Sequence, residues 1–140
     1  MPADFFIDPQ RGMVSSKAHG VLSLADVMSH MNRLCSHPDF RPEFNQLFDF
    51  REVTAFPMSF DELRSLAKRS IFSANSRRAY VVRTDWQFGL GRVFSTYRDL
   101  AGESGIQIFR SMEGALAWLG LAREPDVDRF ASFNPQIIAA

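Results

Sequence analysis

Hydrophobic residues follow two spacings along the chain, and the change from one spacing to the other predicts the order of its elements. Residues 79–82, Ala-Tyr-Val-Val, form a short apolar run rich in β-branched and aromatic side chains, which predicts a buried central strand. After a polar break at Thr84 and Asp85, apolar side chains recur every three or four residues, as on one face of a helix. They are Leu90, Val93, Phe94, Tyr97, Leu100 and Ala101. Strand, tight turn and helix form the repeating unit of a parallel α/β sheet.

The N-terminal part predicts a hairpin followed by a helix. Residues 5–7 and 13–19 are expected to form two strands around a Pro- and Gly-containing turn at 8–12, and Gly20 is expected to end the second strand. A helix should begin at Ser23, whose hydroxyl can cap it, and should end before Pro38. Its expected buried stripe contains Leu24, Val27, Met28, Met31, Leu34 and Cys35.

The middle of the chain predicts a short strand at 47–50, a loop at 51–58 and a second helix. Ser59 and Glu62 have the spacing of a capping box, in which each side chain bonds the backbone N–H of the other residue. This helix is expected to close near 75–76. Its inward positions are Phe60, Leu63, Leu66, Ala67 and Ile71.

Near the C-terminus, the sequence predicts a strand at 106–109 and a last helix capped by Ser111 and stopped at Gly120. Its inward positions are Met112, Ala115, Leu116 and Leu119. The sum, β-β-α-β-α-β-α-β-α, predicts an α/β fold with a single five-stranded mixed, mostly parallel sheet. Residues 1–120 should form this domain, and residues 121–140 a C-terminal tail.

The tail is expected to pack its apolar residues onto this body or onto a neighbouring copy, which would make the protein a homo-oligomer. These residues are Phe130, Phe133 and Ile137. If they stayed in water, they would expose an apolar patch of a kind that soluble monomers avoid.

Composition narrows the range of partners and compartments. Lys plus Arg and Asp plus Glu are both 16 of 140 residues, so no net charge draws the protein to nucleic acid. No apolar run reaches the ~20 residues of a membrane span, and the N-terminus has no pattern of a signal peptide. The single cysteine, Cys35, cannot form an internal disulfide, so we expect a cytoplasmic protein.

Four stretches, in this order along the chain, resemble the SpoIIAA-like branch of the STAS superfamily, the anti-sigma-factor antagonist fold. They are Gly20 to Ser23, Leu47 to Thr54, Phe88 to Phe94, and Ile108 to Leu119. The resemblance implies strands in sequential order, helices mainly on one face of the sheet, and a kinship in fold with CRAL-TRIO lipid-binding domains. It also implies a regulatory module that works through protein partners.

The chain departs from this family at the phosphorylated serine. In the phosphorylated antagonists, Asp-Ser-Ser-Gly begins the helix after the strand that ends in Asp; counted from Asp49, those positions here are Pro57, Met58, Ser59 and Phe60. Methionine replaces the phosphoacceptor and cannot be phosphorylated. We therefore expect the fold without the serine phospho-switch, and we interpret Ser59 as a helix cap.

Ligands of an open parallel sheet bind outside the carboxyl ends of its strands. The candidate binding residues at that edge are Asp49, Arg51, Asp85, Trp86, Phe88, Gly89, Arg92, Arg110 and Ser111. The glycines near Phe88 match neither a P-loop nor a dinucleotide fingerprint, so they predict a tight turn and close packing. We expect Arg92 to pair with Asp49 or Asp85.

No set of residues predicts catalysis, a metal site or a cofactor. Cys35 is expected to be a buried hydrophobe, and His30 and His37 fit no metal-ligand spacing. The sequence therefore predicts a non-catalytic binding module, not an enzyme. A protein partner is the first expectation; the alternative is a carrier or sensor of a small apolar ligand or lipid, suggested by the 14 Phe residues. A cavity of a few hundred Å³ lined by Phe and Met would favour the alternative.

Overall fold

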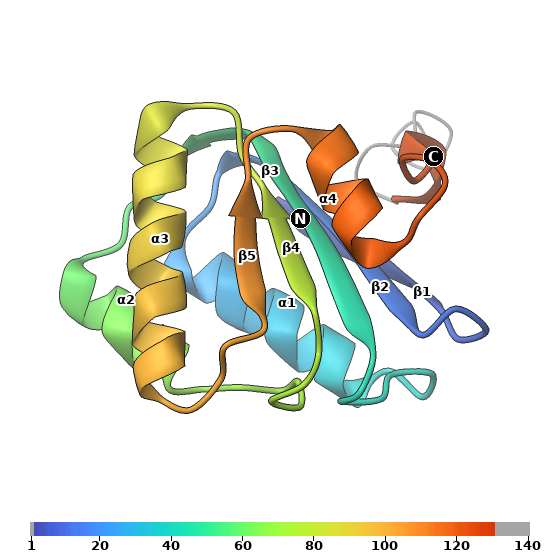
Figure 1. The fold of residues 1–140 in the computed structure, drawn as a ribbon. Coiled ribbons are helices and arrows are strands. Elements are labelled where there is room, and N and C mark those ends of the chain that lie inside the picture. The colour runs from blue at the N-terminus through green and yellow to red at the C-terminus, as the bar shows by residue number, and fades with distance from the viewer. Residues whose placement is uncertain (1, 131–140) are drawn as a thin grey trace, which may run out of the picture.

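A computed structural model describes residues 2–130, and in this part of the chain five strands form a single sheet (Figure 1). The strands lie in sequence order: β1 (Ala3–Asp8), β2 (Met13–Val21), β3 (Asn45–Ala55), β4 (Arg78–Val81) and β5 (Ile106–Phe109). β1 is antiparallel to β2, and every other neighbouring pair is parallel. The predicted mixed, mostly parallel sheet is therefore confirmed.

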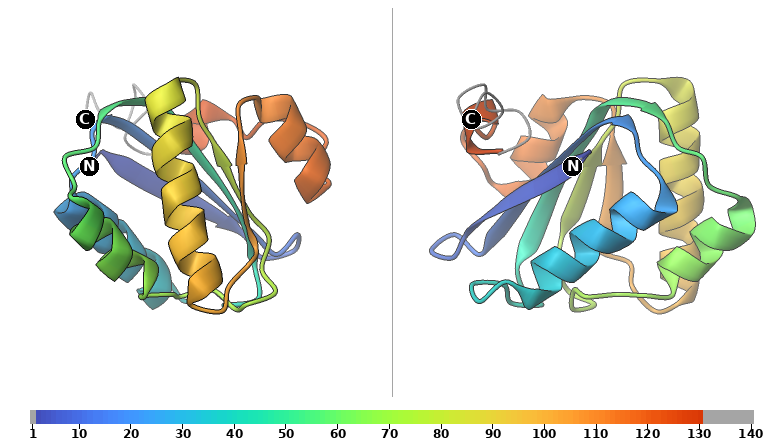
Figure 2. Two further views of the ribbon diagram at one scale, coloured as in Figure 1. Left: turned by 60° about the vertical axis from the view of Figure 1, so that its left-hand side comes forward. Right: turned by 180° about the vertical axis from the view of Figure 1, so that it is seen from behind.

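The helices divide unequally between the two faces of the sheet. They are α1 (Leu24–Ser36), α2 (Phe60–Ala67), α3 (Asp85–Leu100) and α4 (Met112–Leu119), followed by a 3₁₀ turn, η1 (Val127–Arg129). α1, α2 and α3 cover one face, and α4 lies against the other (Figures 1 and 2). Each of the first three helices connects parallel neighbours in the same lateral direction, and right-handed crossovers of that kind place their helices on one face. α4 follows the last strand and is free of this constraint.

Alternation along β3 and β4 gives each face of the sheet its own core. Leu47, Ala79 and Val81 pack beneath α4, whereas Phe48 and Tyr80 point toward α1, α2 and α3. Val81 is fully buried, as expected, and the buried Val82 follows the last residue of β4. The central strand of the sheet is β3; β4 is its inner neighbour, which corrects the predicted position of residues 79–82.

The helix termini follow their predicted chemistry. Ser23 and Ser59 cap α1 and α2 through complete capping boxes with Asp26 and Glu62, and Ser111 caps α4. Gly120 ends α4 at a φ of 74°, a left-handed backbone conformation that glycine adopts without strain.

Three of the predicted element boundaries differ from the structure, at the ends of β3, β2 and α2. β3 continues through residues 51–55, where a loop was predicted, because Val53 and Ala55 pair with Gly20 and Val21 of β2. β2 thus also continues past Gly20, through an irregular register. α2 ends at Ala67, well before the predicted close near 75–76.

Four residues predicted to point inward are exposed: Cys35, Phe60, Leu100 and Ala101, the last of which follows α3 as its C-cap. Phe60 and Leu100 are the first residue of α2 and the last of α3, so the apolar spacing continues past the part of each helix that packs. Cys35 follows the fully buried Leu34 and is rotated by about 100° from it around the helix axis, which turns it away from the sheet.

Candidate functional site

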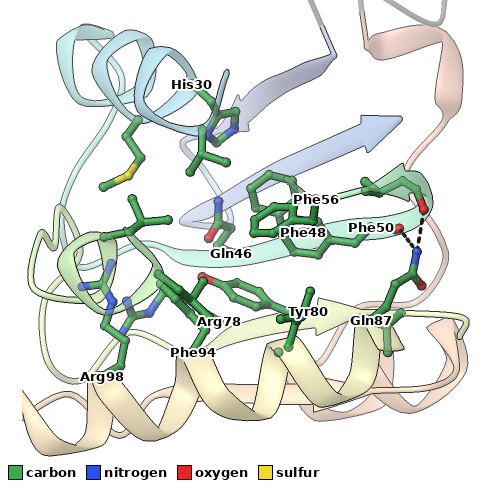
Figure 3. A pocket seen from close by; sticks show the side chains of 18 of the residues that line it. His30, Gln46, Phe48, Phe50, Phe56, Arg78, Tyr80, Gln87, Phe94 and Arg98 are labelled. Carbon is green, nitrogen blue, oxygen red and sulfur yellow. Dashed lines mark hydrogen bonds between the residues drawn. The ribbon is translucent and has the colours of Figure 1, made fainter. Parts of the chain in front are cut away.

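A cavity of about 120 Å³ lies between the sheet and the three helices on its larger side (Figure 3). Its walls are mostly apolar and come from β3, β4, α1, α2, α3 and the loops between them. The aromatic residues of the wall are Phe48, Phe50, Phe56, Phe72, Tyr80, Trp86 and Phe94. A dry engineered cavity of about 150 Å³ is enough to hold benzene, so this space suits a small ligand better than a long-chain lipid.

Two buried arginines lie at one end of the cavity. Arg78 begins β4 and is 1% exposed; Arg98 lies in the last turn of α3 and is 5% exposed. Both donate to the same oxygen, Oε2 of Glu103, from Nη1 at 3.3 Å and 3.0 Å respectively. Arg98 also donates from Nη2 to the carbonyl oxygen of Arg69 at 2.7 Å. Within the described residues, Nε and Nη2 of Arg78 and Nε of Arg98 have no hydrogen-bond acceptor.

The aromatic rings near these arginines fix their positions. The guanidinium of Arg78 lies over the Phe72 ring and that of Arg98 over the Phe94 ring, at 5.4 Å and 5.2 Å from the ring centroids. The hydroxyl of Tyr80 points toward the two arginines (Figure 3). Burial raises the pKa of Tyr80 above its ordinary value, so the phenol stays protonated and can donate a hydrogen bond.

Three hydrogen-bonded side chains, Ser16, His30 and Gln46, form an uncharged polar cluster on the β2 side of the cavity. His30 of α1 and Gln46 of β3 each place a side-chain nitrogen close to Oγ of Ser16, at 3.0 Å and 3.1 Å. Burial lowers the pKa of His30 to about 4, and the charge of Arg33 contributes in the same direction, against an opposing effect of Asp4. The imidazole is therefore uncharged at neutral pH.

Gln87 closes the end of the cavity opposite the arginines (Figure 3). Its Nε2 donates to the carbonyl oxygens of Phe50 and Val53 at 3.0 Å and 2.8 Å. Its Oε1 accepts from the backbone N–H groups of Arg83 and Thr84. This one side chain thus joins the start of α3 to β3. Trp86, beside it, lines the cavity and is 42% exposed.

The candidate residues predicted at the carboxyl edge occupy several separate places. Asp49 and Arg51 lie with Lys17 on the α4 side of β2 and β3, under the segment that follows α4. Asp49 accepts from Lys17 Nζ at 2.9 Å and from Arg51 Nε and Nη2 at 3.0 Å and 2.9 Å, and Arg51 also bonds Glu124. Burial alone would raise the pKa of Asp49, but the hydrogen bonds from Arg51 and Lys17 outweigh it and lower the pKa. Asp49 is therefore part of a buried ion-pair network.

Asp85, Arg92 and Arg110 are exposed and lie around the half-buried Phe88, where β5 ends and α3 begins. Arg110 bonds Asp85 at 2.6 Å and lies over the Phe88 ring at 4.4 Å; Arg92 lies over the same ring at 5.9 Å. The expected pairing of Arg92 with Asp49 or Asp85 is thus wrong, since Asp49 pairs with Lys17 and Arg51, and Asp85 with Arg110. Gly89 is exposed in α3, and Ser111 caps α4.

Sequence reasoning found Trp86 but missed the remaining polar residues of the cavity: His30, Gln46, Arg78, Gln87 and Arg98. One feature of the sequence does indicate the arginine end of the cavity. Arg78 and Tyr80 are two residues apart on a strand that is otherwise apolar, so they share the face that carries Phe48 on β3. A charge on the buried face of an inner strand marks a site, because burying it is costly unless something compensates.

In residues 2–130, no group of three or more His, Cys, Asp or Glu side chains could hold a metal ion. Among the same residues, no helix combines the length and the apolar character needed to cross a membrane.

The fold and the cavity define a small α/β domain with a mostly apolar cavity beneath three of its helices. Among solved structures, the chain is similar to an uncharacterized protein of the DUF3478 family from Shewanella loihica PV-4, which has a SpoIIAA-like fold. The two sequences are 22% identical; the match covers 84% of this chain and 93% of the other, with a TM-score of 0.57. No family model matches this sequence, and no curated protein matches it. The likeness confirms the expected SpoIIAA-like fold, and at this identity it shows the fold alone.

Proposed function

We propose that this domain is a non-catalytic binding module that holds a small, largely apolar molecule in the cavity beneath α1, α2 and α3. The cavity is the observation that supports this function. Its volume of about 120 Å³ is below the few hundred Å³ expected to favour a carrier or sensor of a small apolar ligand or lipid, so the proposal is limited to a ligand of the size of a benzene ring or a short alkyl chain. This is the second of the two functions expected from the sequence, restricted to small ligands.

A protein partner, the first expectation, has less support. The large apolar side chains that are most exposed, Val21, Phe60 and Leu100, lie on β2, α2 and α3. Exposed hydrophobic residues that occur singly are normal on soluble proteins and define no docking surface. The cavity therefore carries the proposal.

The test is a titration of the ¹⁵N-labelled protein with 1-hexanol, followed by amide chemical shifts. Saturable shifts at residues that line the cavity, such as Phe48, Leu66 and Tyr80, would support the proposal. Leu66→Phe, which fills part of the space, should weaken binding. Leu116→Phe is the matched control, because Leu116 packs on the opposite face of the sheet. If 1-hexanol gives no saturable shifts, or binds both variants equally, the cavity is not the binding site.

A further inference from the structure

The two arginines at one end of the cavity carry more positive charge than the described residues compensate. Arg78 and Arg98 share a single carboxylate oxygen of Glu103, so the cluster has two cations and one anion. No Asp or Glu is among the cavity-lining residues of the described chain, and His30 is uncharged at neutral pH. One positive charge is therefore left over in an almost fully buried position.

The unused donors are on the same side chains. Nε and Nη2 of Arg78 and Nε of Arg98 are buried and have no acceptor within the described residues. Guanidinium groups are the usual receptors for carboxylate and phosphate groups, because their N–H donors match two oxygens at once. An unmatched buried charge with free donors is costly, so a protein that keeps one gains stability when an anion enters.

The charged and the apolar contacts of the cavity are separated along its length, and the uncharged His30 and Gln46 on its β2 side are bonded to Ser16. The arginines and the Tyr80 hydroxyl are at one end, the rings of Phe48, Phe50 and Phe56 lie between, and Gln87 is at the other end (Figure 3). Gln87 uses both of its polar atoms on the backbone, so no polar contact is offered there. A ligand with one charged end and an apolar remainder matches this arrangement.

We propose that the cavity selects a small amphipathic anion, a short-chain or aromatic carboxylic acid, whose carboxylate is bound by Arg78 and Arg98 with the Tyr80 hydroxyl as a further donor. This proposal rests on the function proposed above and specifies the chemical class of its ligand. The arginines also bind Glu103, which holds them in place for the ligand. Each guanidinium has five N–H donors, so the carboxylate of Glu103 leaves capacity for a second anion.

The experiment compares three probes with the same six-carbon chain: hexanoate, 1-hexanol and hexylamine, which is a cation at pH 7. Each is titrated into the ¹⁵N-labelled protein at pH 7 and low salt, and dissociation constants are taken from the lining amides. We expect hexanoate to bind about tenfold or more tightly than 1-hexanol, as for a hydrogen-bonded charge pair, and hexylamine to bind most weakly.

The variant Arg78→Met separates the contribution of charge to the binding affinity from the contribution of apolar contacts. The change keeps a long apolar side chain and leaves Arg98 and Glu103 as a neutral pair. It should reduce hexanoate affinity about tenfold and leave 1-hexanol affinity within about twofold, since only the charged end loses its donors. Arg77→Met is the matched control: it removes a charge from the preceding residue, which is exposed and lies over Trp118. It should change neither affinity. Arg98→Met repeats the test if Arg78→Met does not fold.

The outcomes separate the two proposals. If 1-hexanol binds in the cavity and hexanoate binds no more tightly, the anion selectivity is wrong and the apolar binding function stands. If hexanoate is preferred but both arginine variants keep the preference, the arginines are not its receptor and this inference fails. If none of the three probes binds, both proposals are wrong.

Discussion

At the scale of single residues, the buried side chains of the cavity differ in their charge at neutral pH. His30 is 2% exposed and its imidazole is neutral, because burial and Arg33 disfavour the charged form. Burial lowers the pKa of Arg98, but a guanidinium starts so far above neutral pH that Arg98 stays charged. The site therefore has a fixed positive end and a neutral polar side wall at physiological pH.

Acid should weaken the fold through His30. The pKa of His30 is about 4 in the folded chain and 6.5 as its ordinary value, so between these pH values the unfolded chain binds more protons. Stability is fully present above pH 6.5 and is lost as pH falls toward 4. At about 1.4 kcal/mol per pH unit, the loss at pH 4 is on the order of 3 kcal/mol.

Urea unfolding at pH 7 and pH 4 measures this loss, and His30→Gln is the comparison. Glutamine can still bond Ser16 and does not titrate, so the variant should lose less stability than the natural chain over that interval. Asp49, whose pKa is also lowered, affects both proteins equally. The same loss of stability in both proteins would show that His30 is not responsible.

Ser59 should act as a structural cap and not as a switch. Its Oγ accepts the N–H of Glu62 at 3.1 Å, and its own N–H donates to Oε1 of Glu62 at 3.1 Å. Ser59→Ala should cost about 1 kcal/mol of unfolding free energy, while Ser59→Asp, which also caps, should cost a few tenths. Thermal melts of both variants check this, with Ser65→Ala, an exposed change within α2, as the control. Phosphate on Ser59 in protein from its native cells would contradict the structural role.

At the scale of elements, β4 depends on burial along its whole length. Val81 is 0% exposed and packs with Ala79 and Met112 in the apolar core beneath α4. Val81→Asp should abolish soluble folding, because a carboxylate in this core is neither paired nor hydrated. Arg83→Asp, two residues later and exposed, is the control. A soluble Val81→Asp protein with an unchanged melting curve would refute the position of this strand in the core.

The elements were predictable where a local pattern determines them. Ser59 and Glu62 are three residues apart, and that spacing suffices for a capping box. The second half of β3 was missed because it is held by Gly20 and Val21, residues about 33 positions earlier in the chain. The cavity was missed for the same reason: Arg78 and Arg98 meet at Glu103 only after β4 and α3 have folded. The local spacing of residue types does not reveal such contacts between residues far apart in the sequence.

At the scale of the whole molecule, the two faces of the sheet are covered in different ways. The face under α1, α2 and α3 encloses the cavity, while the face under α4 holds the Asp49 ion pairs and is closed by the segment from Leu121 to Phe130. Arg51 joins this segment to β3 through Glu124. This arrangement places the predicted binding residues on both faces of the sheet. Trp86 lines the cavity, whereas Asp49 and Arg51 lie on the face under α4.

Deleting residues 126–140 should destabilise the fold. Phe130 is 3% exposed and its ring contacts that of Phe6 in β1, with centroids 4.9 Å apart; Phe133 and Ile137, also predicted to pack, lie outside the described residues. Loss of Phe130 alone should cost about 3 kcal/mol of unfolding free energy, because it uncovers Phe6 and leaves a space beside Val127. Phe130→Ala in the full chain isolates that part, and Arg123→Ala, exposed in the same segment, is its control. The melting temperature reports the packing onto this body, and the sedimentation coefficient reports any dimer that the segment holds. If neither changes in the deleted protein, the C-terminal residues do not contribute to the fold or to assembly.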